Sequence, residues 1–140
     1  MAYDDATAKM RADFLTRISS IASANVLDEN EAGDFTQKDG GIWCRNVILD
    51  GNGFNISLGT TITRRNPGVF VSQVFVPVGD GTTVIDSAIA EIISDYSNLT
   101  LPVGDAEGTV IRFLACYATK VGSQNGQYQK NVNMPFWMDF

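Results

Sequence analysis

The spacing of apolar residues predicts two helices that each bury one face. Apolar side chains recur at helical spacing over residues 5–24 and again over residues 82–97. They are Met10, Phe14, Ile18, Ile21 and Ala22 in the first segment, and Ile85, Ala88, Ile89, Ile92, Ile93 and Tyr96 in the second. A stripe at this spacing is typical of a helix packed on a core. We expect both helices to cover a sheet, with partner binding as the alternative for the first.

Five segments have the apolar pattern of β-strands. They span residues 42–49, 54–58, 69–78, 109–121 and 128–136. Between the first two lies Asp50-Gly51-Asn52-Gly53, a strong hairpin-turn signal, so these two should pair. The third is apolar on both faces, which indicates a central strand covered on each side, with Phe75 and Val76 buried. Pro135 cannot donate a ladder hydrogen bond, so the last strand should have an edge or a bend there.

Polar, glycine-containing segments connect these elements, at residues 25–41, 59–67, 97–108 and 122–127. The first is acidic, but its spacing does not match the calcium loop with carboxylates at positions 1, 3, 5 and 12. The second contains Arg64-Arg65, which could form a small anion site, an intersubunit contact or a solvated pair. The apolar carboxyl end should either fold onto its own domain or dock on a neighbour.

The order helix, hairpin, strand, helix, strand, strand predicts an α+β fold. We expect a single domain over residues 1–140, with a mainly antiparallel or mixed sheet of about five strands flanked by two helices. The sheet and second helix should occupy residues 42–138. The strand–helix–strand part, residues 69–121, could form one right-handed crossover.

Length and charge narrow the class of protein. The chain has 140 residues, of which 44% are apolar and 19% charged, enough for a core without metal or disulfide support. Its net charge is −6. Because a nucleic-acid binder needs a basic face that releases counterions, tight DNA or RNA binding is not expected.

Several catalytic systems are excluded by residue type. Histidine is absent, which removes serine–histidine and cysteine–histidine nucleophiles and imidazole metal ligands. No Cys-x-x-Cys or Gly-x-Ser-x-Gly motif occurs, and the carboxylates are scattered. Gly79-Asp80-Gly81 lacks the remainder of a dinucleotide or phosphate-loop motif. We therefore predict no catalytic, cofactor or metal site, and expect a protein other than an enzyme.

The cysteines and the hydropathy of the chain indicate in which cellular compartment the protein resides. Cys44 and Cys116 lie in apolar segments and should be buried thiols in a reducing compartment. No apolar run reaches the roughly 18–20 residues that span a bilayer. The amino-terminal residues are acidic and lack the apolar centre of a signal peptide. These features predict a cytosolic protein without a membrane partner.

Residue types typical of protein interfaces gather at a few places. Aromatic residues, Met and Arg are enriched in interface cores. Five residues of these types are candidates for an oligomer or partner interface: Trp43, Arg64, Arg65, Trp137 and Phe140. A small acidic domain with an apolar end fits a component of an oligomeric structure.

An ordered set of motifs resembles one known family. The motifs are Arg64-Arg65-x-x-Gly68, Gln73-Val74-Phe75-Val76-Pro77-x-Gly79-x-Gly81, Val121-Gly122 and Tyr128-Gln129-x-Asn131-Val132-x-x-Pro135-Phe136. In this order, over about residues 42–138, the chain resembles the tail-terminator-like proteins of tailed bacteriophages.

The resemblance implies an α/β subunit that forms a ring, usually a hexamer, on the head-proximal end of the tail tube. Such a ring stops tube polymerisation and provides the surface that joins the head. The implied partners are further copies of the chain, the tube protein and head–tail connector or neck proteins. DNA would pass through the channel without tight binding, and the protein would reside in the virion after assembly in the host cytoplasm. Another neck, connector or tube component is the alternative, followed by a small hydrolase.

Overall fold

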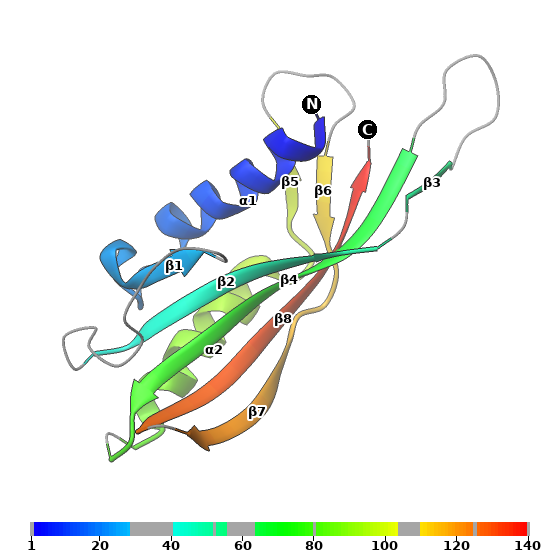
Figure 1. The fold of residues 1–140 in the computed structure, drawn as a ribbon. Coiled ribbons are helices and arrows are strands. Elements are labelled where there is room, and N and C mark those ends of the chain that lie inside the picture. Colours follow the sequence, from blue (N-terminus) through cyan, green and yellow to red (C-terminus); the bar gives the residue numbers. More distant parts are fainter. Residues whose placement is uncertain are drawn as a thin grey trace.

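The chain folds into an α+β domain with two α-helices and eight strands in the part that the structure, a computed structural model, describes (Figure 1). That part comprises residues 2–28, 41–51, 53–55, 64–79, 81–103, 110–124 and 126–139. The helices are α1 (Ala2–Arg17) and α2 (Thr83–Tyr96), with a 3-10 turn at Ser23–Asn25. The strands are β1 (Val26–Asp28), β2 (Trp43–Asp50), β3 (Phe54–Asn55), β4 (Arg64–Pro77), β5 (Thr100–Pro102), β6 (Val110–Phe113), β7 (Tyr117–Gln124) and β8 (Gln127–Asp139).

The strands form one mixed sheet in the order β1-β2-β4-β8-β6-β5. β1 runs parallel to β2, and every other described pair is antiparallel. β3 extends the sheet beside β4 and β7 extends it beside β8. The expected α+β class and mixed sheet are confirmed, but the expected number of strands was too low.

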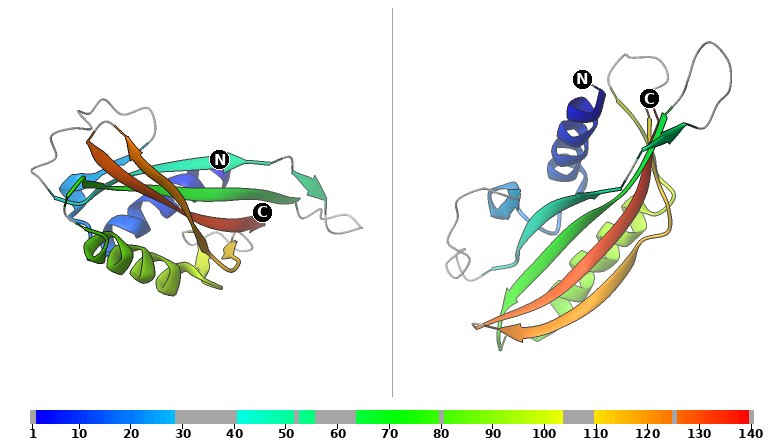
Figure 2. Two further views of the ribbon diagram at one scale, coloured as in Figure 1. Left: turned by 90° about the horizontal axis from the view of Figure 1, so that it is seen from below. Right: turned by 45° about the vertical axis from the view of Figure 1, so that its right-hand side comes forward.

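β4 and β8 are the long central strands of the sheet. They pair in continuous antiparallel register from Arg65 opposite Asp139 to Pro77 opposite Gln127. The sheet twists strongly along this pair (Figure 2), as sheets of L-residues do. The expectation that the segment around residues 69–78 is a central strand is confirmed, but the expectation that it is covered on each side is wrong, because both described helices pack on the same face.

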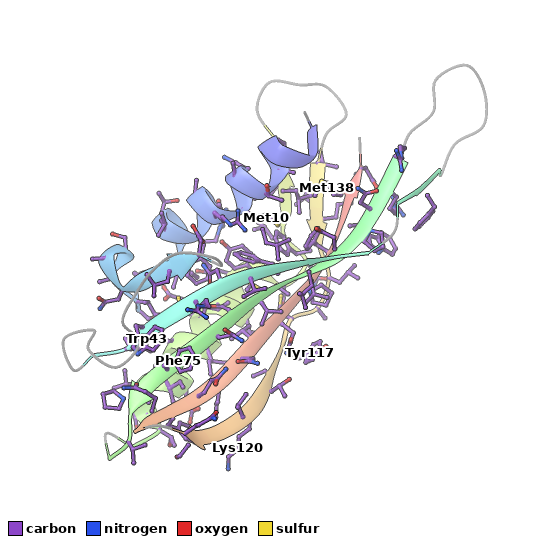
Figure 3. All side chains as sticks on the ribbon, in the orientation of Figure 1. Met10, Trp43, Phe75, Tyr117, Lys120 and Met138 are labelled. Carbon is purple, nitrogen blue, oxygen red and sulfur yellow. The ribbon has the colours of Figure 1, made fainter. Side chains whose placement is uncertain are left out.

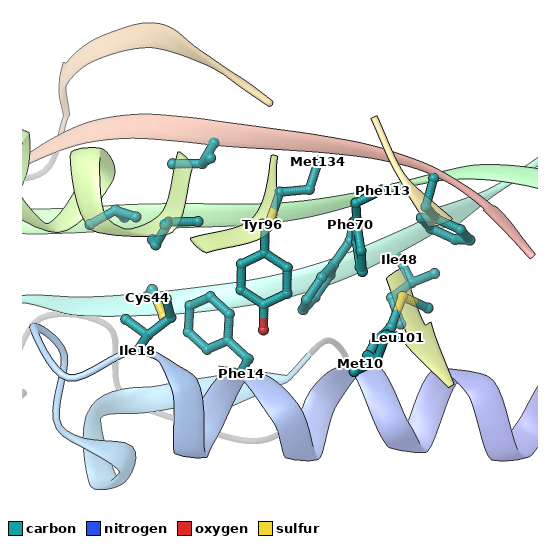
Figure 4. Packing of buried hydrophobic residues seen from close by; sticks show 14 of the residues in the cluster. Met10, Phe14, Ile18, Cys44, Ile48, Phe70, Tyr96, Leu101, Phe113 and Met134 are labelled. Atoms are coloured by element: carbon teal, nitrogen blue, oxygen red, sulfur yellow. The ribbon is translucent and has the colours of Figure 1, made fainter. Parts of the chain in front are cut away.

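One face of the sheet carries the hydrophobic core. Alternate residues of four strands point to this face, and both helices pack their apolar stripes on it. Phe14 of α1 stacks near Tyr96 of α2, while Phe70 and Phe113 approach the Tyr96 ring edge-on (Figure 4). Because successive strand residues point to opposite faces, the intervening residues form a second face that neither described helix covers.

The two helices match their predicted faces but differ in extent. α2 buries Ile85, Ile89 and Ile92 as predicted. α1 ends at Arg17, whereas the apolar spacing predicted helix to residue 24. The Glu91 carboxylate of α2 accepts hydrogen bonds from the backbone N–H groups of Ser19 and Ser20. These two donors would otherwise continue the helix, so a tertiary contact replaces its last turn.

The predicted hairpin between residues 42–49 and 54–58 is wrong. β2 pairs with β4 from Trp43 opposite Phe75 to Asp50 opposite Gly68, and β3 also pairs with β4 rather than with β2. Residues 56–58 lie outside the described part. Arg64 and Arg65, predicted in a loop, form the first residues of β4. A long partner strand therefore overrides the local turn signal.

The predicted strand over residues 109–121 is interrupted. β6 and β7 both pair with β8, and residues 114–116 between them are outside either strand. Pro135 of β8 lies opposite this break and accepts a hydrogen bond from the Leu114 N–H. Since the nitrogen and oxygen of a strand residue point to the same side, the missing N–H of Pro135 faces the break. This confirms the expected irregularity at Pro135, which lies inside the sheet.

Two short strands were not predicted, because their sequences show little periodicity. Val26–Asp28 and Thr100–Pro102 form β1 and β5, although both segments were expected to be loops. Phe75 was expected to be a core residue, but it points to the uncovered face and is half-buried. Its neighbour Val76 is buried as expected.

Candidate assembly surface

The uncovered face of the sheet has a mixed polar and apolar character. β8 presents Gln129, Asn131, Asn133 and Pro135 there, while β4 presents Pro67, Val69 and Gln73. Leu49 of β2 and Tyr117 of β7 are more than half exposed on the same face. Exposed apolar side chains that lie together on a sheet face can serve as a protein contact surface.

At one end of this face, three strands bring four side chains together. We call Arg65, Arg112, Trp137 and Asp139 the Arg65 cluster. Arg65 Nε and Nη2 donate to the two carboxylate oxygens of Asp139, at 2.7 and 2.8 Å. The Arg65 guanidinium also lies over the Trp137 ring, 4.3 Å from its centroid. The cross-strand register explains the group, because Arg65 pairs with Asp139 and Arg112 pairs with Trp137.

The Arg65 cluster contains two guanidinium groups and one carboxylate. Asp139 is only 7% exposed and directs both oxygens to Arg65. Arg112 Nε lies 4.0 Å from Asp139, and its side chain is 55% exposed. The bidentate hydrogen bonds to Asp139 and the cation–π contact with Trp137 together fix the orientation of the Arg65 side chain. Arg112 therefore keeps most of its five donors directed to solvent, where a carboxylate from another molecule could bind.

A shallow apolar hollow lies beside the Arg65 cluster. Its volume is ≈ 320 Å³, and it is lined by Leu49, Asp50, Gly51, Pro67, Gly68 and Val69. Pro67 is directly opposite Trp137 in the register of β4 and β8. The hollow and the cluster thus adjoin. The hollow is mainly apolar, with Asp50 at its edge, and the cluster has two guanidinium groups and one carboxylate.

Trp43 lies away from this surface. Its ring stacks on Phe75 at 4.2 Å between centroids, and Nε1 donates to Gln127 Oε1 at 3.4 Å. Trp43 is 1% exposed. Figure 3 shows Trp43 and Phe75 together at one end of the sheet and Met138 at the other. The single chain already buries this indole, so it offers no surface to a partner.

The structure brings together only two of the predicted interface residues. Arg65 and Trp137 are in contact, and Arg64 is exposed at the start of β4. Trp43 is at the far end, and Phe140 lies outside the described residues. Sequence reasoning missed Arg112 and Asp139, because their proximity to Arg65 depends on strand register. The alternation of apolar and charged residues in Val110–Phe113 was the available signal for an outward-pointing Arg112.

A polar network joins the two helices on the opposite side of the sheet. Tyr96 donates to Asp13 at 2.8 Å, and Arg17 forms two hydrogen bonds with the same carboxylate. Burial alone would raise the pKa of Asp13, but the hydrogen bonds from Arg17 and Tyr96 outweigh it and lower the pKa. Burial, followed by the contact with Asp13, raises the pKa of Tyr96. The network holds α1 against α2. Tyr96 stays protonated, because its hydroxyl donates to Asp13.

The described residues were compared with the requirements of a metal site and of a reactive thiol. No group of three or more Cys, Asp or Glu side chains among them could hold a metal ion. Burial raises the pKa of the Cys44 thiol to about 12, so it is a poor nucleophile. Cys44 and Cys116 are free thiols, the first buried and the second partly exposed. No helix in the described part is both long and apolar enough to cross a membrane.

Comparison with known proteins supports the fold and gives no family. No family model matches the sequence, and no curated protein matches it. A solved structure of a protein whose name states no activity is similar, with a TM-score of 0.68 and 20% sequence identity. The similarity covers 96% of this chain and 96% of that chain. At this identity the likeness concerns the fold alone, an α+β domain with a curled mixed sheet.

Proposed function

We propose that this chain is a structural protein of a tailed-bacteriophage virion. In this proposal it forms a ring that caps the head-proximal end of the tail tube, stops tube polymerisation and provides the surface that joins the head. Its partners are further copies of itself, the tube protein and the connector or neck proteins. DNA passes through the ring without tight binding.

The observation that carries the proposal is the position of three of the motifs. The Arg-Arg-x-x-Gly and Gln-Val-Phe-Val-Pro motifs both lie in β4, and the Tyr-Gln…Pro-Phe motif lies in β8. β4 and β8 are directly paired over their whole shared length. Motifs far apart in the sequence thus form one structural unit, which supports a family resemblance over a chance match of separate fragments.

The described surface agrees with a structural role in two respects. Apolar and cationic side chains gather on an uncovered sheet face, as in the Arg65 cluster and the adjoining hollow. The titratable groups with shifted pKa values mainly join helices or strands to one another, as Asp13, Glu91 and Arg65 do. Groups of this kind stabilise a subunit, whereas a catalytic group would face a cleft.

Assembly of phage tails with and without this chain tests the proposal. We expect particles made without it to have tails of uncontrolled length that do not join heads, and expression of the chain in trans to restore normal length. Tails of normal length that fail to join heads would favour a neck or connector protein. Normal tails with normal infectivity would contradict a role in the virion.

A further inference from the structure

The outward side of α2 is acidic and carries no positive charge of its own. The helix contains Asp86, Glu91 and Asp95 and no Lys or Arg. Its most exposed positions between these carboxylates carry small side chains, at Ser87, Ala90 and Ser94. Asp86 pairs with Lys130 at 2.6 Å but keeps 51% of its side chain exposed. Another chain can therefore approach this helix closely and meet its three carboxylates, of which Asp86 also pairs with Lys130 and Glu91 also accepts hydrogen bonds from Ser19 and Ser20.

The Arg65 cluster is opposite in charge and lies on the opposite face of the sheet. Arg112 is exposed there, with Trp137 between it and the apolar hollow, and its only described carboxylate neighbour is already bonded to Arg65. The helices cover the inward face, since their apolar residues join the core cluster. One molecule thus presents a cationic surface on one side and an anionic surface on the other. Complementary potentials of this kind orient two partners and select their register.

From this complementarity we propose that the Arg65 cluster and its adjoining hollow bind the outward side of α2 of a second copy of this chain. This inference rests on the proposed function and specifies the contact that would build its ring. Because the two surfaces differ, the contact is head-to-tail and leaves a free surface of each kind on every pair. Subunits are therefore added until the last one contacts the first and the ring closes. A contact between identical surfaces stops at a dimer.

Two charge reversals on exposed residues test the contact. Arg112→Glu reverses the cationic side, and Ser87→Lys places a positive charge on α2. Both residues are exposed, so the fold should persist, which circular dichroism can verify. Each variant alone should sediment as a monomer at concentrations where wild type assembles, with affinity reduced roughly tenfold or more by like-charge repulsion.

A mixture of the two variants distinguishes head-to-tail assembly from other contacts. In an alternating ring, the unchanged Arg112 of one chain meets the unchanged α2 of the next, and Glu at position 112 meets Lys at position 87. The mixture should therefore recover the wild-type sedimentation coefficient. The neutral Ser87→Gln is the control, because it enlarges the same side chain without adding a charge and should assemble normally.

Several results would overturn the inference without deciding the proposed function. Normal assembly of Arg112→Glu would exclude the Arg65 cluster, and normal assembly of Ser87→Lys would exclude α2 as its partner. Two monomeric variants that do not recover on mixing would also contradict the contact. The length of tails formed without the chain, as described above, decides the proposed function separately.

Discussion

At the scale of single residues, Gly68 illustrates how tightly the two central strands pack. It lies in β4 directly opposite Phe136 of β8. A Cβ atom at this position would come within 2.6 Å of the Phe136 ring and 2.8 Å of the Leu49 carbonyl oxygen. Both atoms belong to packed strands that cannot easily move. Glycine is therefore required by space at this position.

We predict that Gly68→Ala lowers the free energy of unfolding by roughly 1–3 kcal/mol, the usual cost of overpacking a close contact. Chemical denaturation measures this difference. Gly41→Ala is the matched control, because a Cβ there has no neighbour within 4 Å. Equal stability of the two variants would contradict the packing described around Phe136.

A second prediction for a single residue concerns Glu91, whose carboxylate accepts hydrogen bonds from Ser19 and Ser20 in the segment after α1. Burial alone would raise its pKa, but hydrogen bonds from Ser20 and Ser19 outweigh it and lower the pKa from 4.5 to about 2. A carboxylate with a lowered pKa stabilises the folded state fully above pH 4.5, and this contribution is lost as the pH falls toward 2. Glu91→Gln, which does not titrate, should be less stable by roughly 1 kcal/mol at neutral pH.

Thermal unfolding of wild type and Glu91→Gln across this pH range is the measurement. The difference in melting temperature should shrink below pH 4.5 and nearly vanish near pH 2. Asp13 titrates in both proteins, so its contribution cancels from the difference. A difference that stays constant across the range would contradict the role assigned to the Glu91 carboxylate.

Contacts of this kind could not be predicted from the sequence. Arg65 and Trp137 were recognised by residue type, yet their partner Asp139 was one of many scattered carboxylates. Arg112 likewise gave only a weak signal of its direction. Their grouping follows from the register of three strands, and register depends on the whole sheet. The hydrogen bonds of Glu91 likewise join it to Ser19 and Ser20, which are distant in the sequence.

At the scale of elements, α2 provides the most direct test of core packing. Ile89 is 6% exposed and lies in the apolar stripe of α2, whereas Val84 of the same helix is 52% exposed. We predict that Ile89→Ala lowers the free energy of unfolding by roughly 2–5 kcal/mol through lost burial and the cavity left behind.

Val84→Ala removes a similar aliphatic side chain from the exposed side of the same helix and should cost less than about 1 kcal/mol. Denaturant titration of both variants makes the comparison. A larger effect at Val84 than at Ile89 would mean that the helix presents a different face to the sheet.

The elements themselves were partly predictable, for identifiable reasons. α2 and β4 are long and strongly periodic, so their type and position followed from their patterns. The turn signal at Asp50–Gly53 suggested a hairpin, but the continuous apolar strand β4 pairs with both neighbouring segments instead. The break between β6 and β7 depends on Pro135, which is on another strand. Local patterns cannot report which strand a segment will meet.

At the scale of the whole molecule, the negative net charge disfavours binding to DNA. The net charge is −6, and Arg11, Arg17, Arg65 and Lys130 pair with carboxylates of the same chain. A surface of this kind releases few counterions from a duplex. We predict no tight duplex binding at physiological salt in a filter assay. Nanomolar, salt-sensitive binding would contradict this and favour a nucleic-acid function.

The central claim is that copies of this chain assemble head-to-tail into a closed ring. Native mass spectrometry of the purified wild-type chain, combined with electron microscopy of the same sample, tests it most directly. The account predicts closed rings of one size, and six chains of 15.2 kDa would have a mass of about 91 kDa. A monomer at all concentrations, or a dimer with two-fold symmetry, would contradict it.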